Sequence, residues 1–98
     1  MHKTGYVYII TDKHHTLLYV GVTSDLTNRI LQHKNKTYKN SFSARYNLDK
    51  LVYHEHYDSI STAIEQEKRL KAGSGRKKEE LICKMNPGWK DLFESLFS

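Results

Sequence analysis

The feature that most constrains this 98-residue chain is a change of hydrophobic period in its first third. Residues 6–10 and 17–20 form two short runs rich in β-branched and aromatic residues, separated by a polar interval. Such runs are typical of the two strands of a hairpin. After Gly21 the spacing becomes helical, because Leu26 and Ile30 stand four residues apart. This part of the chain is therefore predicted to fold as strand, strand, tight turn and helix.

The rest of the chain continues the mixed pattern. Residues 51–57 alternate again and predict a third strand, and the helix after it ends near Lys71 at a glycine-rich stop. Two further helices are predicted over residues 76–85 and 89–97, with Pro87 between them. The order ββαβααα indicates one α+β domain spanning residues 1–98, with a small three-stranded, partly antiparallel sheet flanked by helices.

Composition narrows the environment and the partners of the chain. Sixteen Lys and Arg against 11 Asp and Glu give a net charge of +5, which suits a polyanion such as nucleic acid and is also common in ordinary soluble proteins. The single cysteine, Cys83, excludes an internal disulfide and favours a reducing cytoplasm. Since no apolar run approaches the length of a membrane span, we expect a soluble, cytoplasmic protein with no membrane partner.

Two tyrosine motifs and an arginine carry a resemblance to a known family. The order Tyr6-Val7-Tyr8, Tyr19-Val20-Gly21 and then Arg29 resembles the motifs of the GIY-YIG nuclease superfamily. The sequence is most similar to its small single-domain bacterial branch, a group of uncharacterised proteins similar to the nuclease module of the excision-repair incision subunit. The resemblance covers nearly the whole chain. It implies the fold of that superfamily and a metal-dependent endonuclease that hydrolyses phosphodiester bonds in DNA, in repair or recombination.

The resemblance also implies roles for individual residues. Tyr8 is the candidate general base for the attacking water, and Tyr19 would position the phosphate or the water. Arg29 would stabilise the charge of the transition state, because guanidinium offers paired donors to phosphate. His33, four residues later on the same predicted helix, is the candidate proton relay. A phenol is a poor base at neutral pH unless a nearby cation or a strong hydrogen bond stabilises the phenolate.

Glu67 is the most informative residue of the helix that ends near Lys71. On a helical wheel it falls inside the apolar stripe of Ala63, Ile64 and Leu70. A carboxylate there is costly unless it is paired or bound to a metal. One interpretation is that the edge of the stripe is exposed at that point, or that Glu67 pairs with a structural arginine. The other is that Glu67 is the metal ligand that the resemblance implies in this helix. A single carboxylate suits one Mg²⁺ or Mn²⁺ ion.

Basic residues outside the motifs are the candidate nucleic-acid contacts. The polar segment 35–50 carries cations among regularly spaced aromatic residues, an arrangement that suits a phosphate backbone and its bases. Phe42 and Tyr46 are equally explained as anchors of the connection onto the core. Three cations at the start of a helix oppose its dipole, which favours a binding role for them. The predicted contacts are Lys36, Lys39, Arg45, Arg76, Lys77, Lys78 and, by resemblance, Asn86.

One position departs from the family pattern, since Tyr6 stands where the first motif has a glycine and Gly5 lies one residue earlier. That glycine carries no reactive group, so activity is expected to survive. The alternative function is a non-catalytic nucleic-acid-binding module on the same fold, which would not require a buried carboxylate. A protein-interaction surface around Trp89 and Phe93 is the least favoured interpretation. DNA is expected over RNA, a protein partner could supply targeting, and the sequence sets neither the substrate structure nor the oligomeric state.

Overall fold

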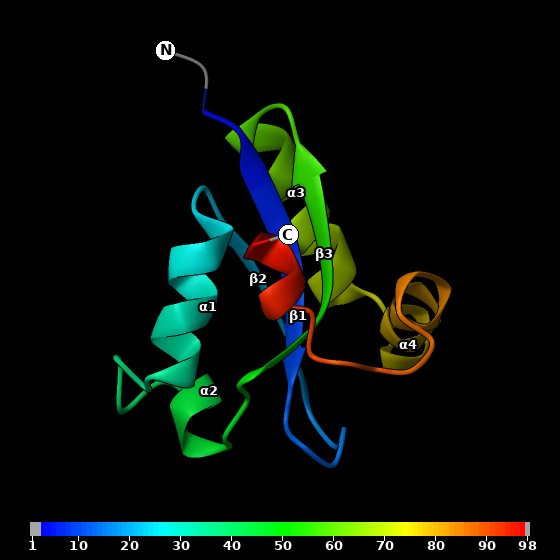
Figure 1. Cartoon of the computed structure of the whole chain (residues 1–98). Coiled ribbons are helices and arrows are strands. Elements are labelled where there is room, and N and C mark those ends of the chain that lie inside the picture. The colour runs from blue at the N-terminus through cyan, green and yellow to red at the C-terminus, as the bar shows by residue number, and fades with distance from the viewer. Residues whose placement is uncertain (1–2, 98) are drawn as a thin grey trace.

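A three-stranded sheet stands between two layers of helices (Figure 1). The structure, a computed structural model, describes residues 3–97. β1 (Gly5–Thr11) lies at the centre, between β2 (Leu18–Thr23) and β3 (Lys50–Tyr57). Both neighbours run antiparallel to β1, so the sheet is antiparallel throughout. The predicted α+β fold with a small three-stranded sheet is confirmed.

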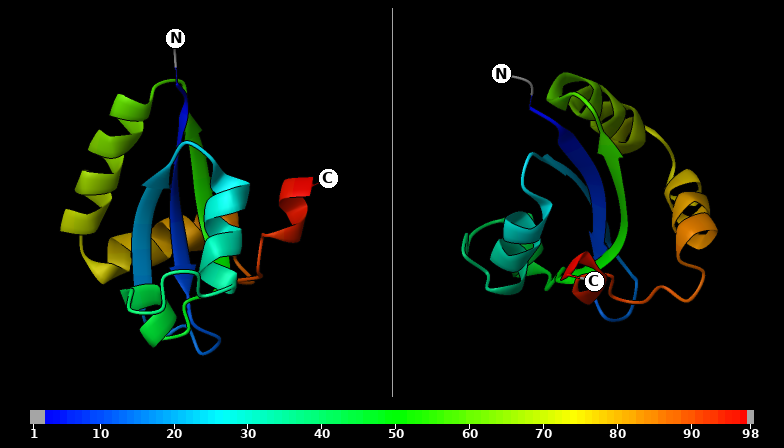
Figure 2. Two further views of the ribbon diagram at one scale, coloured as in Figure 1. Left: turned by 90° about the vertical axis from the view of Figure 1, so that its left-hand side faces the viewer. Right: turned by 45° about the horizontal axis from the view of Figure 1, so that its top comes forward.

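One face of the sheet is covered by α3 (Ile60–Ala72) and α4 (Gly75–Met85) (Figure 2). Val7 and Ile9 of the central strand point to this face and pack into a buried cluster with Ala63. The approach of α3 to β1 is close at the start of the strand. Here Gly5 matters, because a Cβ at this position would lie 2.8 Å from the Cβ of Ala63.

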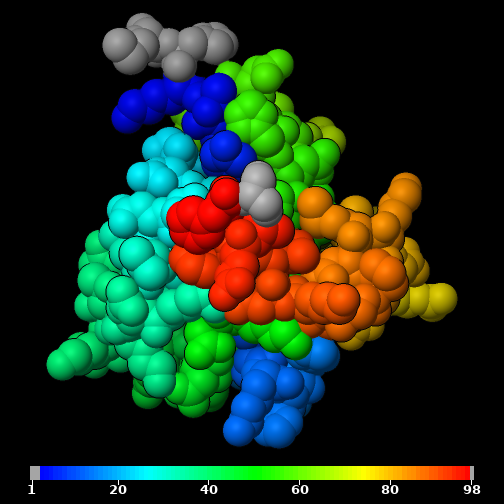
Figure 3. Space-filling model, in the orientation of Figure 1, coloured from blue at the N-terminus to red at the C-terminus, as the bar shows by residue number. Residues whose placement is uncertain are grey.

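The opposite face is covered by α1 (Leu26–Lys34), the short helix α2 (Phe42–Arg45) and a C-terminal tail ending in the 3₁₀ helix η1 (Glu94–Phe97). Tyr8 and Ile10 alternate with the residues of the first face and point to this one. The space-filling view shows the tail lying across the front of the molecule, between the layer of α1 and α4 (Figure 3). Helix and tail pack against the sheet through Leu26, Ile30, Leu92, Phe93 and Leu96.

The tail is held along the first residues of β3 by hydrogen bonds as well as by packing. The backbone N–H of Leu92 donates to the carbonyl of Leu51 at 2.7 Å. In return the N–H of Leu51 donates to the Asp91 carboxylate at 3.2 Å. None of the helices within residues 3–97 is long and apolar enough to cross a membrane.

Two local features differ from the sequence prediction: the end of β2, and the tail, where the helix predicted over residues 89–97 is reduced to the 3₁₀ helix Glu94–Phe97. β2 does not stop at Gly21 but continues to Thr23, since its pairing with β1 extends to the partners Tyr6 and Thr23. The polar segment before β3 contains the short helix α2, and the hydroxyl of its N-cap residue Ser41 accepts the N–H of Ala44. This helix has four residues and therefore no hydrophobic period that a sequence could display.

Candidate active site

The predicted site residues meet at the edge strand β2, between α1 and α3. They come from four elements: Tyr8 from β1, Tyr19 from β2, Arg29 and His33 from α1, and Glu67 from α3. The Tyr8 hydroxyl hydrogen-bonds to His33, and the charges or dipoles of the other three act on the ionisation of Tyr8. The structure therefore brings all five together around the Tyr8 hydroxyl.

Gly21 makes room for the Tyr8 ring. The two residues are direct partners in the pairing of β1 with β2. A Cβ at position 21 would lie 2.3 Å from both Cζ and the hydroxyl oxygen of Tyr8. The ring thus lies across the glycine backbone, where no side chain fits. This gives the glycine of the second motif a steric reason.

The Tyr8 hydroxyl is buried and uncharged. The side chain is 2% exposed, and its oxygen lies 2.9 Å from Nε2 of His33. Burial, the largest cause, and the neighbouring Tyr19 raise the pKa of Tyr8 above its ordinary value. Arg29 lowers this pKa and Glu67 raises it again by smaller amounts. At neutral pH Tyr8 is therefore a neutral phenol with a proton to donate.

His33 links the buried tyrosine to α2. Burial and the positive charge of Arg29 lower the pKa of His33 to about 4. At neutral pH the ring is therefore uncharged, with one nitrogen a donor and the other an acceptor. Its Nδ1 lies 2.8 Å from the Ser43 hydroxyl. A hydrogen-bonded path thus runs from the core of the sheet through α1 to α2.

Glu67 lies at the rim of the site and not in the core. Its side chain is 14% exposed and its carboxylate lies 3.2 Å from Nζ of Lys71, one turn later in α3. The same ammonium group sits 5.5 Å from the centre of the Tyr19 ring. Ile64, which the sequence placed in the same apolar stripe, is 38% exposed. The stripe is therefore partly open, and the ion partner of Glu67 is a lysine where an arginine was the predicted alternative.

The donors at Glu67 fit a hard divalent cation. Within residues 3–97 no three His, Cys, Asp or Glu side chains gather in a group able to hold a metal by themselves. Mg²⁺ and Mn²⁺ are commonly bound through one or two carboxylates, with water and substrate phosphate completing the shell. The Glu67 carboxylate beside Tyr8 satisfies that requirement if Lys71 releases or shares it.

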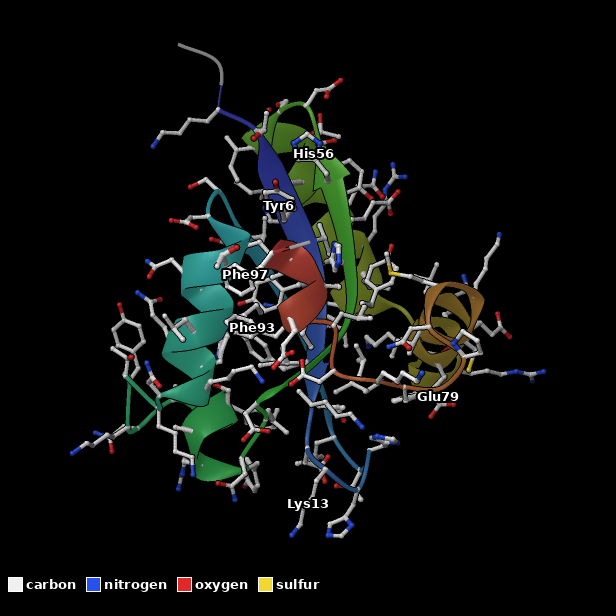
Figure 4. All side chains as sticks on the ribbon, in the orientation of Figure 1. Tyr6, Lys13, His56, Glu79, Phe93 and Phe97 are labelled. Atoms are coloured by element: carbon white, nitrogen blue, oxygen red, sulfur yellow. The ribbon has the colours of Figure 1, made fainter. Side chains whose placement is uncertain are left out.

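Tyr6, which replaces the motif glycine, packs on the β3 side of β1. Its ring centre lies 4.9 Å from that of His56, and the two side chains lie close together in Figure 4. Tyr8 has Gly21 of β2, on the other side of β1, beside it. The bulky residue at the glycine position therefore contacts β3 and does not displace the Tyr8 ring from Gly21.

Asn86 is buried and hydrogen-bonded within the protein. Its buried amide donates to the carbonyls of Val52 and Lys90, and its Oδ1 accepts the N–H of Lys90. Both amide protons and the carbonyl oxygen are thus engaged in holding the tail against β3. Asn86 therefore has a structural role in the fold, and its contact with nucleic acid stays a prediction.

The predicted basic contacts lie in the two helical layers, on opposite faces of the sheet. Lys36, Lys39 and Arg45 surround α2, while Arg76, Lys77 and Lys78 begin α4. Some of them have partners within the protein. Arg76 pairs with Glu80 at 3.4 Å, and the Lys78 ammonium donates to the Gly73 carbonyl at 3.0 Å, where it caps α3.

The aromatic residues of α2 extend the site toward solvent. The Phe42 ring stacks on Tyr19 with 6.4 Å between ring centres, and Tyr46 lies 4.8 Å further along. Both Phe42 and Tyr46 are exposed. They are therefore surface residues beside the site and not anchors buried in the core.

Ser43 and Lys71 are two neighbours of the site that the sequence did not single out. The i,i+4 spacing of Glu67 and Lys71 is a signal that could have predicted their ion pair. Ser43 is ten residues from His33 across an irregular connection. No periodicity relates the two, so only the folded chain shows the contact.

Residues 4–80 match the GIY-YIG catalytic domain. The chain belongs to the GIY-YIG family. It is 35% identical to a UPF0213 protein of Staphylococcus saprophyticus over 77 residues, which are 79% of this chain and 92% of that protein. A UPF0213 protein of Syntrophus aciditrophicus is 34% identical over 83 residues, 85% of this chain and 93% of the relative. The predicted resemblance to small GIY-YIG proteins is confirmed.

A solved structure supports the same assignment of the fold. The solution NMR structure of a UPF0213 protein from Bacillus halodurans is similar to this GIY-YIG domain, with a TM-score of 0.56 and 27% sequence identity. The match covers 90% of this chain and 92% of that protein. A GIY-YIG catalytic domain is a nuclease-type domain, for which nucleic acid is the expected ligand.

Proposed function

We propose that this GIY-YIG domain is a divalent-metal-dependent endonuclease that hydrolyses phosphodiester bonds, in DNA rather than RNA, in repair or recombination. The observation that carries the proposal is the 2.9 Å hydrogen bond from Tyr8 to an uncharged His33, beside Arg29 and Glu67. Hydrolysis of a phosphodiester needs a proton acceptor, a cation for the phosphoryl oxygens and help for the departing oxygen. These side chains offer groups of each kind.

Tyr8 and His33 would act as a pair. As the attacking water gives a proton to the Tyr8 oxygen, Tyr8 gives its own hydroxyl proton to Nε2 of His33, so no free phenolate forms. The low pKa of His33 opposes this step in the unbound protein. A bound phosphate brings negative charge that favours the imidazolium, so the base gains strength when substrate is present.

Arg29 and Glu67 would act on the phosphate. The guanidinium of Arg29 can donate to two phosphoryl oxygens at once, and Tyr19 can orient one of them or the water. Glu67 would hold a Mg²⁺ or Mn²⁺ ion, which when bound supplies positive charge to the scissile phosphate and the departing oxygen. Lys71 is then free to contact the backbone of the substrate.

The test is cleavage of labelled single-stranded, duplex and branched DNAs, and of matching RNAs, with Mg²⁺, Mn²⁺ or EDTA. Glu67→Gln and Arg29→Ala are expected to lower the cleavage rate by at least about 10²-fold while the circular dichroism spectrum stays unchanged. Glu65→Gln, on the exposed part of the same helix, is the matched control and should cut like the wild type. Cleavage in EDTA, or full activity of Glu67→Gln, would contradict the proposal.

A non-catalytic nucleic-acid-binding module is the second candidate, and the burial of Tyr8 favours it. A side chain that is 2% exposed has little contact with the water that it would have to activate. This function predicts binding of nucleic acid without cleavage under any metal condition. It further predicts that Glu67→Gln leaves the affinity for nucleic acid unchanged.

A further inference from the structure

Ser43 is a buried polar residue whose hydroxyl connects the candidate site to the start of α2. It lies in α2 and is 5% exposed. Its Oγ lies 2.8 Å from Nδ1 of His33 and 3.2 Å from the Oγ of Ser41. A buried hydroxyl is costly unless it is hydrogen-bonded, so these contacts account for how a serine is tolerated in this position.

The burial of Tyr8 decides which nitrogen of His33 carries the proton. An uncharged imidazole has one N–H, so either Nε2 donates to Tyr8 or Tyr8 donates to Nε2. In the first case the Tyr8 hydroxyl proton would be buried without an acceptor, since His33 is its hydrogen-bond partner within the described part of the chain. Such a loss costs about 1–3 kcal/mol. In the tautomer with the proton on Nδ1, Tyr8 donates to Nε2 and its hydroxyl proton has an acceptor.

That tautomer requires an acceptor at Nδ1, and Ser43 supplies it. The oxygen of Ser41 already accepts the N–H of Ala44 at the start of α2. When Ser43 donates its proton to Ser41, its own lone pairs face Nδ1 of His33. The hydroxyl protons of Ser43 and Tyr8 and the Nδ1–H of His33 then all meet acceptors, and Nε2 is left as an acceptor.

We infer that Ser43 is a positioning residue that holds His33 in the tautomer protonated at Nδ1, so that Nε2 faces the Tyr8 hydroxyl as a base. Ser43 gains or loses no proton in this role. Its effect on cleavage rests on the proposed nuclease function, whereas its effect on the tautomer does not.

The direct test is ¹⁵N NMR of the histidine rings in the unbound full chain at neutral pH, with His33 assigned by comparison with His33→Gln. The wild type should show His33 protonated at Nδ1 and unprotonated at Nε2. Ser43→Ala should convert part of the population to the other tautomer, and Ser43→Thr, which keeps the hydroxyl, should restore the first. Ser24→Ala, an exposed serine between β2 and α1, is the control that should change nothing.

A wild-type ring protonated at Nε2 would overturn the inference, and this spectrum needs no variant to fold. An unchanged tautomer in a folded Ser43→Ala protein would overturn it as well. In the cleavage assay, Ser43→Ala is expected to lower kcat by about 10- to 100-fold with KM nearly unchanged, as for other partners that orient a histidine. If no substrate is cut yet the tautomer shifts as expected, the nuclease proposal fails and the role of Ser43 stands.

Discussion

The buried polar network at the turn between β1 and β2 differs from the one at the candidate site in what its members can do with a proton. At the turn, several hydrogen bonds converge on one carboxylate. Asp12 accepts from the N–H of Thr16 at 2.8 Å, the hydroxyl of Thr16 at 2.7 Å and the N–H of Leu17 at 3.0 Å. Burial alone would raise the pKa of Asp12, but these hydrogen bonds outweigh it and lower the pKa well below the ordinary value.

At the site the network has no fixed charge. Tyr8, His33 and Ser43 can each donate and accept a hydrogen bond. Burial raises the pKa of Tyr8 and lowers the pKa of His33, so it disfavours the charged form of both. Hydrogen bonding of buried polar groups thus has two outcomes. At the turn, donors converge on Asp12 and stabilise its negative charge. At the site, each side chain can both donate and accept, so a proton can move along the network. We therefore expect the turn to govern stability and the site to govern chemistry.

The largest effect is expected when the site network is cut at its centre. Tyr8→Phe removes the group that links water to His33, so the metal-dependent cleavage rate should fall by about 10²–10⁴-fold. The free energy of unfolding should change by only about 1 kcal/mol, since one hydrogen bond is lost. Cleavage assays and urea denaturation check the two numbers. Tyr53→Phe, which breaks a 2.7 Å bond to Glu55 on β3, is the control and should keep full activity.

Gly21→Ala should lower both the stability of the fold and the cleavage rate, because its methyl group would overlap the Tyr8 ring. Overpacking of this kind typically costs about 1–3 kcal/mol, and a displaced Tyr8 should also cut more slowly. Urea denaturation gives the first quantity and a cleavage assay the second. Gly75→Ala, at a position where a Cβ meets nothing within 4 Å, is the matched control. A stable and fully active Gly21→Ala variant would show that the ring does not depend on the glycine.

Asp12→Asn should act on stability alone. It weakens charge-assisted hydrogen bonds to Thr16 and Leu17 and should lower the free energy of unfolding by about 2 kcal/mol, with cleavage unchanged at temperatures well below Tm. Because the pKa of Asp12 is lower in the folded state, this stabilisation is present above about pH 4 and is lost as the pH falls further. The free energy of unfolding of the wild type, measured as a function of pH, should therefore fall below about pH 4 by an amount that the variant does not show.

The smallest effect is a second, separate pH dependence from His33. Its folded-state pKa of about 4 lies below the ordinary 6.5, so between these values the unfolded chain binds more protons. Wild-type stability should therefore fall as the pH drops through this window. His33→Gln should flatten that slope, and His14→Gln, an exposed histidine of the hairpin, should not. A slope that survives His33→Gln would assign it to another group.

The regular elements could be predicted because their periods are long enough to see. The alternation of β1 and the four-residue spacing of Leu26 and Ile30 in α1 are local properties of the sequence. The four-residue spacing of Arg29 and His33 likewise places them on one side of α1, whereas the place of Tyr8 beside them was implied only by the family resemblance.

What the sequence could not provide depends on contacts between distant segments. Asn86 is engaged only because the tail packs along β3, and Ser43 reaches His33 only because α2 folds back onto α1. The rim position of Glu67 was partly predictable from the wheel. The exposure of Ile64 beside it was not, because it depends on how α3 lies over the edge of the sheet.

The tail along β3 has a consequence for the protein in concentrated solution. An open strand edge is a template on which another molecule can add a strand, which is the first step toward aggregation. The bonds that join Leu92 and Asp91 to Leu51 occupy those backbone groups, so the tail stands where a fourth strand would pair. At this edge, the resistance of the protein to aggregation during storage therefore depends on the docked tail more than on the sheet that it covers.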